Sequence, residues 1–189
     1  AARVAIVGIT PGLQQMAIAC RAAQDGLIAR DNVETILQSA TFAGAMRRNL
    51  VAMLDDLGLP GSLGIATTAD LFGSRSDLLH RASCIRDTVV VDGKNYTGHK
   101  PNIFKHPLLR RYVEENLATE LESIPQALIV PCGGAVSAVL QHLGERGRLD
   151  CCRCLLGFPH PSGLNGHRVR QFAERREAMR RVIAARKID

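Results

Sequence analysis

Two short apolar runs rich in β-branched residues limit what this chain can fold into more than any other feature. They are RVAIVG (residues 3–8) and ALIVPC (residues 127–132), and each is followed by a glycine turn and a helical pattern. Such runs are typical of buried strands. CCRCLLGF (residues 151–158) and residues 84–91 also read as extended. Strands that alternate with helices predict an α/β fold around a mainly parallel central sheet.

Helical patterns fill most of the remaining chain. They cover residues 13–30, residues 31–57, a helix opened by Pro107, a helix after Gly133 and Gly134, and residues 167–187. Residues 62–73 read as a loop or short strand. We find no internal repeat and no linker, so residues 1–189 are expected to form a single domain.

Charge and composition restrict the partners. The 189 residues carry a formal net charge of +6, which favours an anionic partner, with nucleic acid first. No apolar run reaches 18 residues and no leader peptide is visible, so we expect no membrane partner. Because the chain opens directly in a strand, we expect a further segment upstream of it.

Six cysteines are present, three of them within CCRC. Cys132 and Cys154 lie in apolar runs, which favours buried free thiols over a disulfide framework. Free thiols point to a reducing compartment, the cytoplasm or the nucleus. We expect no metal and no other cofactor.

Three segments follow strands: GITPG (residues 8–12), DGKNYTGHKPN (residues 92–102) and GFPHPSGLNGHR (residues 157–168). In open α/β sheets, ligands bind beyond the carboxyl ends of the strands. In the third segment, prolines and glycines shape a loop that displays a ring nitrogen, a hydroxyl, a leucine and an amide. These segments predict a binding cleft.

In this order, the segments resemble the uracil-DNA glycosylase superfamily. GITPG is similar to its Gly-x-x-Pro-Gly turn, HPSGLN to its second motif, and DGKNYTGHKP to a loop of the single-strand-selective monofunctional branch. The mismatch-specific branch is the other near one. The resemblance implies a three-layer α/β/α sandwich, a uracil-DNA glycosylase-like domain over residues 1–189, and excision of uracil or another deaminated base from flipped-out nucleotides.

The resemblance also implies roles for single residues. His160 would donate a hydrogen bond to the uracil O2 as negative charge develops there, and Thr10 would position water. The base pocket would comprise Gly8, Ile9, Pro11, Gly12, Phe42 and Asn95. Contacts to DNA would come from Ser162, Gly163, Leu164, Asn165 and Arg168, with Leu164 as a wedge in the base stack. The alternatives are a loop-ordering histidine, a turn serine, a core leucine or phenylalanine, a solvated arginine, and an asparagine that orders its own loop.

Two positions depart from the family pattern. Thr10 stands where the family usually has Asp or Asn, and a hydroxyl has no useful basicity at neutral pH. Ala82 falls where a uracil-reading Asn is expected, unless the alignment slips.

We therefore expect a monomeric glycosylase acting on damaged single- or double-stranded DNA. The alternative is a catalytically weak or inactive superfamily member that binds such nucleic acid. A nucleotide-phosphate enzyme is a third possibility, but the chain lacks a phosphate-binding Gly-x-x-x-x-Gly-Lys-Ser/Thr loop.

Overall fold

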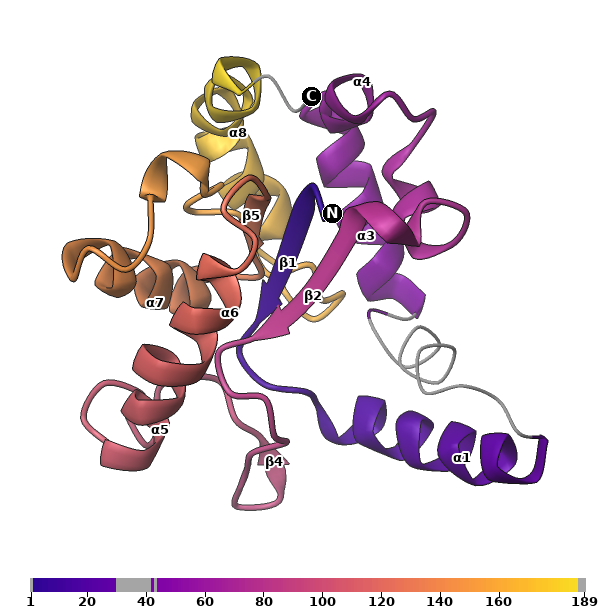
Figure 1. Cartoon of the computed structure of the whole chain (residues 1–189), viewed down its shortest axis with the longest axis vertical. Coiled ribbons are helices and arrows are strands. Elements are labelled where there is room, and N and C mark those ends of the chain that lie inside the picture. Colours follow the sequence, from indigo (N-terminus) through magenta and orange to yellow (C-terminus); the bar gives the residue numbers. More distant parts are fainter. Residues whose placement is uncertain (1, 30–41, 43, 187–189) are drawn as a thin grey trace.

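A computed structural model describes residues 2–29, 42 and 44–186 (Figure 1). The strands are β1 (Val4–Gly8), β2 (Leu79–Ser83), β3 (Val90–Val91), β4 (Lys94–Asn95) and β5 (Leu128–Pro131). The helices are α1 (Leu13–Ala29), α3 (Gly44–Asp56), α4 (Leu59–Leu63), α5 (Pro107–Arg111), α6 (Ala118–Glu122), α7 (Gly134–Glu145) and α8 (Arg168–Ala185). Short 3₁₀ turns are η1 (Thr68–Phe72), η2 (Ser76–Leu78) and η4 (Cys151–Arg153), and η3 (Tyr112–Leu117) is a π-helical segment.

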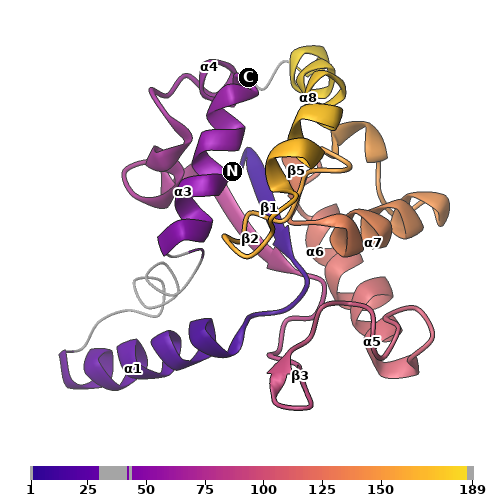
Figure 2. The ribbon, with the colours of Figure 1, turned by 180° about the vertical axis from the view of Figure 1, so that it is seen from behind.

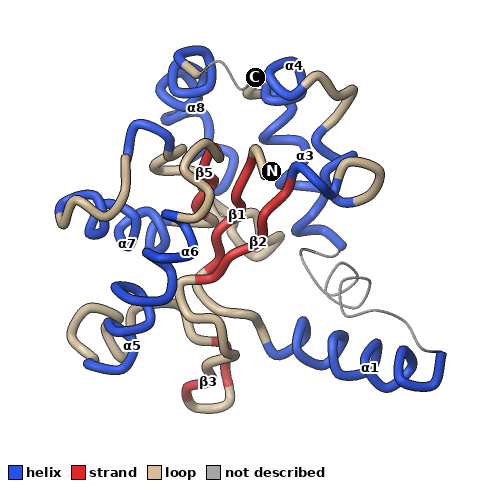
Figure 3. Tube along the Cα trace, viewed as in Figure 1, coloured by secondary structure: helices blue, strands red, loops and turns tan. Residues whose placement is uncertain are grey.

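The central sheet is parallel and has the order β2-β1-β5 (Figure 3). Gly8 at the end of β1 lies opposite Ser83 at the end of β2, and Val7 lies opposite Pro131 of β5. A parallel bridge from Ile129 to Cys154 continues the sheet beyond β5. The carboxyl ends of all three strands therefore meet at one edge, and the predicted α/β class with a parallel sheet is confirmed.

Alternate side chains of β1 enter two separate hydrophobic clusters. Val4 and Ile6 belong to a cluster with side chains of α3, α4 and α8. Ala5 and Val7 belong to a cluster with side chains of η3, α6 and α7. Figures 1 and 2 show α3 and α4 on one side of β1 and α5 to α7 on the other. This alternation follows from the period of two along a strand.

One expected strand lies elsewhere. Residues 84–91 were expected to be extended, but β2 ends at Ser83 and is followed by a turn. Only Val90 and Val91 are extended there, in the β3–β4 hairpin. The three valines suggested a strand, whereas β2 itself mixes buried Leu79 and Ala82 with polar residues.

The CCRCLLGF segment also differs from the expectation. The Asp150 side chain accepts the Cys152 N–H at 2.9 Å and caps the 3₁₀ turn η4. Only Cys154 of this run bridges the sheet. Within residues 62–73, the Thr67 side chain caps η1 in place of a strand. The helix expected over residues 31–57 is described from Gly44 onward as α3, and residues 31–41 and 43 lie outside the described part.

The helix α1 projects from the rest of the molecule in both views (Figures 1 and 2). None of its side chains from residue 13 to residue 25 is buried. Its first turns face the carboxyl edge of the sheet, where the candidate site lies.

Candidate functional site

A cavity of about 1350 Å³ opens at the carboxyl edge of the sheet. It brings together most of the predicted site residues: Gly8, Ile9, Thr10, Pro11, Gly12, Phe42, Asn95, His160, Ser162, Leu164 and Asn165. Gly163 and Arg168 do not line it. The turn after β1 and the loop before α8 are 150 residues apart in sequence, yet they share this one cavity, as the motif order predicts.

The Thr10 hydroxyl links two of the cavity's walls. Its Oγ1 donates to the main-chain carbonyl of Asp87 at 2.6 Å and accepts the Val89 N–H at 3.2 Å. The hydroxyl proton is therefore committed, and one lone pair is left for other partners. Thr10 holds residues 87–89 against the turn that follows β1, and its role toward water stays a prediction.

Asn95 ties the hairpin to the start of α1. Its Oδ1 accepts the Leu13 N–H at 2.8 Å, which satisfies one of the free donors of that helix end. A Cβ at Gly12 would lie 3.1 Å from the Asn95 Nδ2, so the absence of a side chain at Gly12 permits this approach. Asn95 thus orders the start of the neighbouring helix, and its role as a base reader stays a prediction.

His160 has a defined hydrogen-bonding state. Its Nδ1 lies 3.2 Å from the main-chain nitrogen of Ser162, whose N–H it must accept. In a neutral imidazole the other nitrogen then carries the proton, so Nε2–H is a donor with no partner among the described residues. Partial burial in the cavity wall lowers the pKa of His160 and favours this neutral form.

The His160 ring packs against the main chain at Gly133. A Cβ at Gly133 would lie 3.2 Å from the His160 Cβ and 3.5 Å from its Cδ2. Gly133 has φ 103° and ψ 170°, a conformation that is essentially reserved for glycine. It directly precedes α7, so the ring is packed beside the first turn of that helix.

Three polar side chains stabilise the loop that carries His160. The Ser162 Oγ accepts the Leu164 N–H at 3.1 Å, and the Asn165 Nδ2 donates to the His160 carbonyl at 3.2 Å. Arg168 Nη1 donates to the Ser162 carbonyl at 2.9 Å. A fourth tie comes from α3, where Asn49 Nδ2 donates to the Pro161 carbonyl at 2.9 Å. The loop is preorganised by these bonds.

Leu164 is 98% exposed at the rim of this loop. The core-facing alternative for Leu164 is therefore wrong. Gly163 beside it would place a Cβ 3.9 Å from the Ala45 Cβ, which leaves the turn close to α3. A fully exposed leucine on a loop held by hydrogen bonds contributes no buried area to the described part of the protein, so its side chain is accessible from solvent.

Phe42 is both a core and a cavity residue. It is 7% exposed, and its ring packs edge-on against Phe72 with 6.4 Å between centroids. The Arg47 Nε donates to its carbonyl at 2.7 Å. Its ring also lines the cavity, so the two alternatives for this residue are compatible.

Sequence reasoning missed several polar cavity residues. Ser83 ends β2 opposite Gly8, next to the Ala82 position where a base reader was expected. Asp87 follows in the turn after β2, and its Oδ2 accepts the Tyr112 hydroxyl proton at 2.7 Å. Near the start of β2, His80 Nε2 lies 2.8 Å from Glu120 Oε1. Correct placement of β2 would have pointed to Ser83 and Asp87, because both follow its buried residues.

The cysteines and acidic residues form no metal centre in the described part of the chain, where no group of three or more His, Cys, Asp or Glu side chains converges. Each of the six cysteines is a free thiol. Burial raises the pKa of Cys132, in the cavity wall, to about 12, and it also raises that of Cys84. These two thiols are therefore protonated and unreactive at neutral pH.

Comparison with known proteins gives one relative. No family model and no solved structure matches the chain. The chain is 41% identical over 187 residues to YoxB of Bacillus subtilis (strain 168), an uncharacterized protein, and the match covers 96% of this chain and 73% of YoxB. The chain belongs to the YoxB family. None of the described helices has both the length and the apolar character needed to cross a membrane.

Proposed function

We propose that this protein is a monofunctional DNA glycosylase that flips out and excises uracil or another deaminated base. We also propose that its α/β fold is the three-layer α/β/α sandwich of the uracil-DNA glycosylase superfamily, formed by one domain over residues 1–189. On this proposal the protein acts as a monomer in a reducing compartment, the cytoplasm or the nucleus, and uses no metal or other cofactor. Six free thiols are compatible with such a compartment.

The state of His160 carries the proposal. Its Nδ1 accepts the Ser162 N–H, so a neutral ring presents Nε2–H as a donor. Breaking an N-glycosidic bond leaves negative charge on the base, which a fixed donor stabilises without giving up its proton. A neutral imidazole suits this task, and the lowered pKa of His160 keeps it available at neutral pH.

The start of α7 adds to the stabilisation of the departing base. Gly134, Ala135 and Val136 begin this helix and line the cavity beside His160. The first N–H groups of a helix have no partner within it and carry partial positive charge. A base held against His160 would meet this positive end as its own negative charge grows.

The surface around the cavity suits DNA. Leu164 can enter a base stack in place of the flipped nucleotide, because it is exposed on a loop fixed by Ser162 and Asn165. The net charge of +6 favours phosphate. The Arg168 guanidinium donates to the Ser162 carbonyl, so Arg168 supports DNA binding by fixing the conformation of the loop.

A specific observation favours the alternative of a catalytically weak or inactive binder of damaged or single-stranded nucleic acid. The Thr10 proton is donated to the Asp87 carbonyl, and Thr10 has no charge with which to stabilise a sugar cation. If no other residue supplies that charge, the cavity would hold a flipped base without releasing it.

Release of bases from uracil-, hypoxanthine- and xanthine-containing oligonucleotides tests the proposal, read as abasic sites under single-turnover conditions. We expect release from at least one of them, and a loss of about 100- to 1000-fold in rate for His160→Ala. His167→Ala is the matched control, because His167 lies outside the cavity on the same loop. Tight lesion binding without release would instead support the binding protein.

A further inference from the structure

The cavity holds a carboxylate beside the position where Thr10 replaces an acid. Residues 87–89 lie against the turn after β1 because Thr10 bonds to the Asp87 carbonyl at 2.6 Å and to the Val89 N–H at 3.2 Å. Asp87 therefore lines the cavity next to Thr10. Its side chain is exposed to the cavity solvent, so the carboxylate is accessible to a ligand.

One oxygen of Asp87 is fixed and the other is available. The Tyr112 hydroxyl of η3 donates to Oδ2 at 2.7 Å, and this bond raises the pKa of Tyr112, so the phenol keeps its proton. Within the described part of the chain, Oδ1 has no hydrogen-bond partner. A carboxylate anchored at one oxygen is oriented, and it can accept a proton at the other.

The other carboxylate in the cavity is already paired. Glu120 Oε1 lies 2.8 Å from His80 Nε2, and its Oε2 lies 3.9 Å from Arg86 Nη2. His80 is three residues before Ser83 on β2, which is roughly 10 Å from the carboxyl edge of the sheet. Glu120 thus pairs with His80 of β2, whereas the Asp87 main chain is bonded to Thr10.

From this arrangement we infer that Asp87 is the catalytic carboxylate of the site, supplied by the turn after β2 instead of the turn after β1. The inference rests on the proposed glycosylase function. Thr10 is then a positioning residue, which holds the Asp87 main chain in place.

The reaction balances with water as the only co-reactant. The C1′–N bond breaks and its electron pair leaves with the base, whose oxygen accepts a hydrogen bond from His160 Nε2–H. The Asp87 carboxylate stabilises the positive charge on the sugar and accepts a proton from water as the water oxygen bonds to C1′. That proton then passes through solvent to the base anion, and the products are a 1′-hydroxy sugar and the neutral base.

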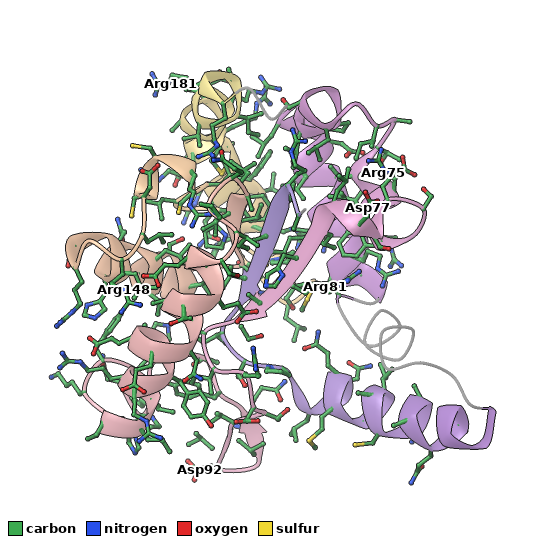
Figure 4. All side chains as sticks on the ribbon, in the orientation of Figure 1. Arg75, Asp77, Arg81, Asp92, Arg148 and Arg181 are labelled. Atoms are coloured by element: carbon green, nitrogen blue, oxygen red, sulfur yellow. The ribbon has the colours of Figure 1, made fainter. Side chains whose placement is uncertain are left out.

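The test compares Asp87→Asn with Asp92→Asn. Asp92 is also an exposed aspartate, but it lies at the tip of the β3–β4 hairpin and points away from the body (Figure 4). It does not line the cavity. The same change of charge is thus made inside and outside the site. We expect a loss of at least 100-fold in the single-turnover rate for Asp87→Asn and a change of less than threefold for Asp92→Asn.

Binding separates catalysis from a structural role. Asp87→Asn removes a negative charge near an anionic ligand, so affinity for a duplex with 2′-fluoro-2′-deoxyuridine, which resists cleavage, should stay equal or rise. If the wild type releases a base and a well-folded Asp87→Asn variant releases it at the same rate, the inference is overturned and the proposed function stands. A loss of affinity and of melting temperature parallel to the loss of rate would also overturn it. No release of any base by the wild type would overturn both.

Discussion

Replacing Gly133 by alanine should displace the His160 ring and so slow base release, although His160 itself is unchanged. Gly133 has φ 103° and ψ 170°, and a side chain in this conformation costs about 1–3 kcal/mol. The new Cβ would also lie 3.2 Å from the His160 Cβ, so the ring must move by a few tenths of an ångström or more. Because a domain of this size loses about 2–4 °C per kcal/mol, we expect the melting temperature to fall by about 2–12 °C.

Gly147→Ala provides a matched control for Gly133→Ala. Gly147 also has a positive φ, 68°, but a Cβ there would meet nothing within 4 Å and it lies outside the cavity. Both variants should lose stability in thermal unfolding, whereas only Gly133→Ala should slow base release, by about tenfold or more at a temperature where both are folded. A Gly133→Ala variant that is folded and as fast as Gly147→Ala would refute the packing argument for His160.

Three further predictions concern other parts of the structure. Burial lowers the pKa of His160, so the unfolded chain takes up the proton first, and the free energy of unfolding should decline as the pH falls below about 6.5, the ordinary histidine pKa. Urea unfolding as a function of pH should show this decline to be larger for the wild type than for His160→Gln. Buried Arg153 donates to the carbonyls of Leu121, Ile124 and Ala127 at 2.8–3.0 Å, so Arg153→Met should cost about 3 kcal/mol in denaturant unfolding, and an unchanged midpoint would contradict this. Leu164→Ala should leave the unfolding free energy within about 0.5 kcal/mol of the wild type, because Leu164 is fully exposed, yet it should weaken binding to a lesion duplex more than to single strands in fluorescence anisotropy.

The parts of the fold that the sequence predicts well are those with one dominant signal. The β1 and β5 runs are buried on both faces and read as unbroken apolar segments, and Pro107 begins α5 at the expected position. β2 escaped prediction because it lies at the edge of the sheet and its polar residues His80, Arg81 and Ser83 line the cavity. A strand that serves the site loses the apolar pattern by which strands are recognised.

The same reason limits prediction of the site. His160 and Leu164 both line the cavity, and the HPSGLN loop that carries them contains the proline and glycine that made it noticeable in the sequence. The hydrogen bond from the Thr10 hydroxyl to the Asp87 carbonyl joins residues 77 positions apart, and no sequence pattern of side chains predicts a bond to a main-chain carbonyl. Asp87 therefore entered the site only with the three-dimensional structure.

The bond from Asn95 to the start of α1 also bears on the dynamics of binding. It joins α1, which projects from the body, to the hairpin, which lies apart from the central sheet (Figures 1 and 3). A nucleic-acid strand that immobilises the hairpin would restrict the fluctuations of α1 as well, so the entropy lost in ordering the second wall is smaller once the first is held. Contacts made at α1 and at the hairpin should consequently be cooperative, and removal of the Asn95 side chain should uncouple them while leaving each surface intact.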